Sequence, residues 1–170
     1  MDVYHLMRGA PAGTLDDVNG RIGAGRVRFA TRLVGPWDAI AIIEADDGAF
    51  AAVQEEILAI EAPKSDRPQD STTAVATRFG LRAPRRSRPP ARFEAFSLIT
   101  MRDGALDETF EAVSEDNDEY RGSSVVDGIF DILLAQGADD YESLRAAIDN
   151  ARGIVAPHGR MQTCHSVAFT

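Results

Sequence analysis

Three residues near the end of the chain, His158, Cys164 and His165, have side chains that can bind a metal ion. A structural zinc site needs four such ligands in a tetrahedral arrangement. Cys164 and His165 are neighbours in a segment with the pattern of a strand, in which adjacent side chains point to opposite faces. The spacing therefore separates two of the three candidate ligands, and we expect no metal site and no cofactor.

Motifs that support other chemistry are missing from the sequence. No Gly-x-Ser-x-Gly nucleophile turn, no phosphate-binding loop and no dinucleotide fingerprint occurs. The glycine-rich run at 20–26 is not followed by the helix that a phosphate cradle requires. We therefore expect a protein that is not an enzyme.

Charge is spread unevenly along the chain, which has a net charge of −9. Residues 1–79 carry −4, residues 80–92 carry +5 and residues 93–170 carry −10. A nucleic-acid surface requires clustered cations, and both large segments have the opposite sign. We expect no direct contact with nucleic acid, and we expect the arginines of residues 80–92 to lie in an exposed linker: Arg82, Arg85, Arg86, Arg88 and Arg92.

The composition is that of a globular protein, with 44% hydrophobic residues in 170. No apolar run reaches the roughly 20 residues that a bilayer-spanning helix requires. The first residues lack the basic and apolar regions of a signal peptide, and a single Cys164 cannot form an internal disulfide. We expect a cytoplasmic protein with no membrane partner.

One short stretch of the sequence occurs twice in similar form. "GPWDAIAIIEADD" begins at Gly35, and "GIFDILLAQGADD" begins at Gly128, 93 positions later. The proline- and arginine-rich stretch 80–92 lies between the two copies and has no periodic apolar pattern, which is typical of a linker. The repeat predicts two domains, 1–79 and 93–170, joined by the linker 80–92.

The same order of elements is predicted in each half. Apolar segments at 3–7 and 95–100 are followed by helical segments, and pairs of apolar runs around 35–38 and 127–130 predict hairpins. Apolar residues at helical spacing then indicate helices over 50–60 and 141–151, with Asp139 as the predicted N-cap of the second. Final strands at 71–79 and 163–169 complete the order. The predicted fold class is α+β, as two tandem ferredoxin-like βαββαβ units.

The apolar strand in each copy of the repeat also indicates how the sheet is covered. A sheet with one face in water should alternate apolar and polar residues, but "AIAIIEA" and "ILLA" hardly alternate. Both faces should therefore be buried, and we expect the two units to pack sheet to sheet in a dimeric α/β-barrel-like arrangement. The units could pair within one chain or between two chains, because the linker is long enough for either.

The frame of the repeat also resembles a known family. "VVDGIFDILLAQGADDYESLRAAI", from Val125 to Ile148, and the more diverged "LVGPWDAIAIIEADDGAFAAV" are similar to the effector-binding domain of Lrp/AsnC transcription regulators. The resemblance covers almost the whole chain as two copies. Members of that family carry an N-terminal helix-turn-helix, for which the strand predicted from Val3 leaves no room.

The resemblance implies a binding site for a small effector, often an amino acid, at the hairpin turns and on the last strand of each domain. The positions that match are Gly35, Asp38, Ser71, Thr73, Gly128, Asp131, Thr163 and His165. An Asp is equally suited to bonding backbone N–H groups at the end of a hairpin. We expect Trp37 and Phe130 to be packing groups rather than ligand platforms.

The resemblance implies a stand-alone module that senses a small molecule and oligomerises, without a DNA-binding domain of its own. It would form a homo-oligomer and act through a DNA-binding member of the family. Two alternatives remain: a small enzyme of the dimeric α/β-barrel type, such as a cofactor-free oxygenase or a haem-degrading protein, and a purely structural oligomerisation module.

Overall fold

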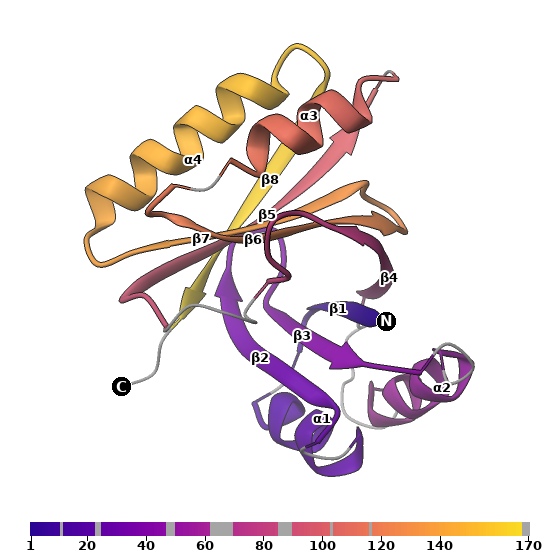
Figure 1. The fold of residues 1–170 in the computed structure, drawn as a ribbon. Helices are drawn as coiled ribbons and strands as arrows, with labels where there is room; N and C mark the ends of the chain where they lie inside the picture. The colour runs from indigo at the N-terminus through magenta and orange to yellow at the C-terminus, as the bar shows by residue number, and fades with distance from the viewer. Residues whose placement is uncertain are drawn as a thin grey trace.

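The computed structural model describes residues 1–10, 12–22, 25–46, 50–61, 70–84, 90–102, 104–115 and 117–167. Its strands are β1 (Asp2–Arg8), β2 (Val27–Val34), β3 (Ala39–Glu44), β4 (Asp70–Phe79), β5 (Phe93–Met101), β6 (Tyr120–Asp127), β7 (Ile132–Ala138) and β8 (Gly159–Val167). Its helices are α1 (Thr14–Ile22), α2 (Phe50–Glu61), α3 (Leu106–Val113) and α4 (Tyr141–Val155). Figure 1 shows α1 and α2 on one side of the strands and α3 and α4 on the other.

The strands form one closed antiparallel barrel in the order β1-β3-β2-β8-β5-β7-β6-β4, with β4 returning to β1. The described strands together hold more residues than the described helices. The predicted fold class, two tandem ferredoxin-like units in a dimeric α/β-barrel-like arrangement, is therefore wrong. The molecule is a single eight-stranded antiparallel sheet closed on itself.

Pairing between the halves is the reason for this difference. Strand β2 is hydrogen-bonded to β8, with Val34 opposite His165, and β4 is hydrogen-bonded to β6, with Val75 opposite Asp127. A sheet that closes in this way has no edge strand left to protect. The order of elements along the chain did not reveal the fold class, because the class depends on which distant strands pair.

The apolar repeat is explained by burial on both faces of its strands. In β3, Ile40 and Ile42 are fully buried in the barrel interior, where they pack with Tyr4, Leu6, Phe96 and Leu133. The alternate residues of β3, among them Ile43, pack outward against α1 and α2. The prediction that both faces are buried is confirmed, and the cover is the rest of the same barrel together with its helices.

Helix α4 begins at Tyr141 as predicted, but its N-cap lies one residue later than the sequence indicated. Its N-cap is Asp140, whose carboxylate accepts hydrogen bonds from the backbone N–H and the hydroxyl of Ser143, both at 2.8 Å. These bonds lower the pKa of Asp140 below its ordinary value. The predicted cap, Asp139, precedes it. The inward face of the helix is apolar, with Leu144, Ile148 and Ala151 buried.

Part of the predicted linker packs on the barrel. The backbone carbonyl of Arg82 accepts a hydrogen bond from Ser123 N–H at 3.1 Å, and Ala83 and Pro84 are buried. Residues 85–89, which include Arg85, Arg86 and Arg88, lie outside the described residues. The division of the chain into domains 1–79 and 93–170 stays a prediction. Among the residues that the structure describes, we find no helix that could cross a membrane.

Candidate functional site

The two hairpin turns of the repeat lie at the same end of the barrel. The N–H of Asp38 donates to the carbonyl of Met7 near the end of β1, at 2.9 Å. The N–H of Asp131 donates to the carbonyl of Ile99 near the end of β5, at 2.8 Å. This end, where β1 and β5 finish and β4 and β8 begin, is called the hairpin end below.

The two aspartates hold the backbone at the hairpin end. The Oδ2 atom of Asp38 accepts a hydrogen bond from Gly9 N–H at 2.5 Å, and that of Asp131 accepts one from Met101 N–H at 2.7 Å. Each carboxylate thus fastens a turn to the residues at the end of β1 or β5. This is the structural role that suits an Asp at a hairpin end. A ligand role for either aspartate stays a prediction.

The two glycines bring each turn against the last strand of the other half. A Cβ atom on Gly35 would lie 2.9 Å from the carbonyl oxygen of Thr163, and one on Gly128 would lie 2.7 Å from the Cβ of Ala74. Candidate residues from the two halves therefore meet at two places. Gly35 lies against Thr163, and Gly128 lies against the segment that contains Thr73.

The strand candidates face outward, away from the barrel interior. The Thr73 hydroxyl is 3.2 Å from His5 Nδ1, and the Thr163 hydroxyl is 2.9 Å from the hydroxyl of Ser97. The His165 ring lies 6.2 Å from the ring of Tyr141 on the helix side. Ser71, two residues before Thr73, lies on the same side of its strand and is half-buried. These candidates do not line the opening at the hairpin end.

A hollow of about 260 Å³ lies at the hairpin end, and we call it the hairpin hollow. Its polar lining comes from strand positions that alternate with the outward-facing candidates. One wall is apolar and includes the aromatic residues of both turns. The lining residues are Arg8, Trp37, Leu98, Thr100, Ile129, Phe130, Arg160 and Gln162.

Trp37 has a buried donor at this hollow. Trp37 is 3% exposed, and its indole Nε1 has no hydrogen-bond partner within the part of the chain that the structure describes. An unsatisfied buried donor costs about 1–3 kcal/mol, so such groups in native proteins call for an explanation. The guanidinium of Arg8 stacks over the same ring at 4.3 Å and donates through Nε to the Pro36 carbonyl at 2.8 Å. The indole N–H and the cation together favour a ligand that accepts hydrogen bonds and carries negative charge.

Trp37 and Phe130, each 3% exposed, pack in the interior core as predicted, whereas the expectation that they are not ligand platforms stays a prediction. Both residues also line a hollow beside Arg8 and Arg160, which the prediction from the sequence did not include. The alternation of inward and outward side chains along β1 could have indicated the position of Arg8. Tyr4 and Leu6 face the interior, so Arg8 at the end of the same series had to face the opening.

Cys164 lies beneath the hairpin hollow and is fully buried. Burial raises the pKa of its thiol, against smaller lowering effects of the Trp37 backbone N–H and the charge of Arg8. Cys164 faces the interior while His165 contacts Tyr141 outside, as the alternation of strand residues predicts. Across the described ranges, no three His, Cys, Asp or Glu side chains gather into a group that could hold a metal ion.

The raised thiol pKa predicts a specific loss of stability at high pH. The unfolded chain releases the Cys164 proton near the ordinary thiol pKa of about 8.5, whereas the folded protein retains it. Deprotonation then favours the unfolded state, so this contribution to stability is complete below pH 8 and declines as the pH rises above about 8.5. Urea unfolding between pH 7 and 10 should show a steeper decline for the natural protein than for Cys164→Ala. Equal slopes would contradict the prediction.

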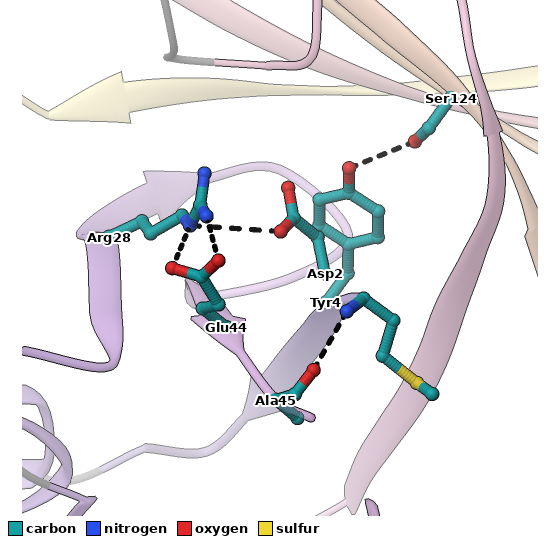
Figure 2. A network of polar contacts seen from close by, with 7 residues as sticks. Asp2, Tyr4, Arg28, Glu44, Ala45 and Ser124 are labelled. Carbon is teal, nitrogen blue, oxygen red and sulfur yellow. Dashed lines mark hydrogen bonds and ion pairs between the residues drawn. The ribbon is translucent and has the colours of Figure 1, made fainter. Parts of the chain in front are cut away.

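The opposite end of the barrel holds a network of polar contacts (Figure 2). Arg28 forms ion pairs with Glu44 and with the buried Asp2, the latter at 3.7 Å. Deeper in the barrel, the Ser124 hydroxyl donates to the Tyr4 hydroxyl at 3.0 Å and joins β6 to β1 across the interior. These contacts fix the first strand to its neighbours at that end.

Comparisons with known proteins bear on the fold alone. No family model matches the chain, and no curated protein matches it in sequence. A solved structure described as a major regulator of staphylococcal pathogenesis is similar over 99% of this chain and 100% of that chain, with a TM-score of 0.52. The two sequences are 6% identical, so the likeness extends to the fold and not to the activity. The resemblance to Lrp/AsnC regulators stays a prediction.

Proposed function

We propose that the protein binds a small molecule bearing a carboxylate in the hairpin hollow, and that an amino acid is among the candidates. The observation that carries the proposal is Trp37, which lines this hollow and whose buried indole Nε1 has no hydrogen-bond partner among the described residues. A carboxylate oxygen would accept that hydrogen bond. Arg8 and Arg160 lie on the same lining and supply the opposite charge.

The size and lining of the hollow limit the ligand. Sites for drug-sized molecules span about 300–1,000 Å³, so a volume of about 260 Å³ suits a smaller metabolite. Leu98, Ile129 and Phe130 form an apolar wall that would receive a short hydrocarbon or aromatic portion. The preferred ligand is thus a small acid with one apolar end.

The biological role of this binding is proposed from the Lrp/AsnC resemblance. The protein would be a cytoplasmic sensor that forms homo-oligomers and passes the ligand signal to a DNA-binding family member. A free, buried Cys164 is compatible with a reducing compartment. Ligand binding at the hairpin hollow can be tested independently of these partners.

Tryptophan fluorescence is the direct assay, because Trp37 is the only tryptophan in the sequence. We expect one or more members of a panel of amino acids and simple carboxylates to change the emission and raise the melting temperature. Arg160→Gln should weaken binding about tenfold, since a hydrogen bond to a charged group contributes about 1.5 kcal/mol or more.

Arg145→Gln is the matched control, because Arg145 is an exposed arginine on α4 and lies outside the hollow. It should bind the ligand as the natural protein does. The proposal fails if no carboxylate in the panel changes either signal. It also fails if Arg160→Gln and Arg145→Gln bind equally well.

A further inference from the structure

A second hollow, of about 410 Å³, lies where α4 ends and β8 begins. Three arginines line it, and they come from three separate segments: Arg102 follows β5, Arg152 lies in the last turn of α4, and Arg160 is the second residue of β8. We call it the arginine hollow. A cluster of three cations is unusual in a chain whose net charge is −9.

The charge balance at the arginine hollow is positive among the described residues that line it and the partners shown for them. Arg152 is paired with Asp149 at 2.7 Å, which offsets one charge. The C-terminal end of a helix carries roughly half a negative charge, which offsets part of another. Three guanidinium groups against these two terms leave a surplus of roughly one to two positive charges.

A purely structural role accounts for only part of the cluster. An arginine in the last turn of a helix is favourable for the helix dipole, and Arg152 fits this description. Arg102 follows β5 and Arg160 lies in β8, so neither belongs to the helix. The chain is held here by backbone bonds, such as that from Arg102 N–H to the His158 carbonyl at 2.8 Å. The fold therefore does not require cationic side chains at 102 and 160.

We propose that the arginine hollow binds a phosphate group, either as free phosphate or as part of a phosphorylated small molecule. Guanidinium groups match phosphate because their planar N–H pairs donate to two oxygens at once. Three of them around one concave site can neutralise a dianion. A volume of about 410 Å³ leaves room beyond the phosphate for a small organic portion.

The arginine hollow and the hairpin hollow share Arg160 and Gln162 in their linings. Arg102 and Arg152 line only the arginine hollow, whereas Arg8 and Trp37 line only the hairpin hollow. The phosphate proposal does not depend on carboxylate binding: Arg160→Gln alters both hollows, whereas Arg102→Gln alters only the arginine hollow.

The test is an amide chemical-shift titration of the full chain at constant ionic strength. Inorganic phosphate and glycerol 2-phosphate are the two probes, and chloride is the reference anion. We expect phosphate to shift the amides of Arg102 and of residues 158–162, with saturation. Tighter binding of glycerol 2-phosphate would identify a phosphorylated molecule as the ligand, and tighter binding of inorganic phosphate would identify the free ion.

Arg102→Gln should raise the dissociation constant for phosphate about tenfold, because it removes a guanidinium that lines only this hollow. Arg21→Gln, an exposed arginine on α1 that lines neither hollow, should leave it unchanged, and so should Trp37→Phe in the hairpin hollow. Equal shifts with chloride would overturn the proposal. So would an Arg102→Gln variant that binds phosphate as the natural protein does.

Discussion

Leu133→Ala and Ile42→Ala should each lower the free energy of unfolding by about 2–5 kcal/mol and shift the same single unfolding transition. Both side chains are fully buried in the barrel interior, one in β7 and one in β3. Each substitution would leave a cavity between packed neighbours. Since the two halves share this interior and are hydrogen-bonded into one sheet, they should unfold together.

Urea unfolding followed by tryptophan fluorescence and by far-ultraviolet circular dichroism measures this directly. Fluorescence reports on Trp37 in the first half, whereas circular dichroism reports on both halves. Val34→Ala is the control, because its side chain is 63% exposed and should change stability by less than about 0.5 kcal/mol. Two separate transitions, one sensitive to Ile42→Ala and the other to Leu133→Ala, would contradict a single cooperative barrel.

Gly35→Ala should destabilise the protein by about 1–3 kcal/mol or more, because its backbone φ of +147° disfavours any residue with a Cβ. The added Cβ would also lie 2.9 Å from the Thr163 carbonyl oxygen and 3.1 Å from the Cα of Cys164. Backbone atoms cannot move aside as a flexible side chain can. The substitution should therefore loosen the contact between the first hairpin turn and β8.

Gly153→Ala is the matched control for this change. Gly153 lies within α4, and a Cβ there would meet no atom within 4 Å. Alanine at such a helical position should stabilise the protein by about 0.5–1 kcal/mol. Thermal or urea unfolding should therefore show opposite signs for the two variants. A neutral Gly35→Ala would show that the turn does not depend on its close approach to β8.

The local features of the fold could be predicted from the sequence, because they depend on neighbouring residues. The unbroken apolar run of β3 indicated burial on both faces, and the alternation at Cys164 and His165 indicated opposite orientations. The N-cap of α4 was one residue away from the prediction, because Asp139 and Asp140 are chemically equal candidates. Only the bond from Ser143 N–H distinguishes them.

The closure of the barrel could not be predicted in the same way. Nothing in the local sequence of β2 indicates that Arg32 pairs with Val167 near the far end of the chain. The hairpin hollow was missed for a related reason. Its lining joins Arg8 from the first strand with Arg160 from the last, and only the closed ring brings them to one opening. The predicted binding residues at Thr163 and His165 point to the opposite side of β8.

Closure of the ring also constrains how the protein folds during synthesis. The ladder between Arg32 and Val167 cannot form until Val167 has left the ribosome. Until then β2 and β5, the two neighbours of β8, would present open edges, which are prone to pair with other chains. Such a high contact order slows folding, because distant segments must meet before their contacts stabilise them. A nascent chain stalled before β8 is thus the form most exposed to aggregation.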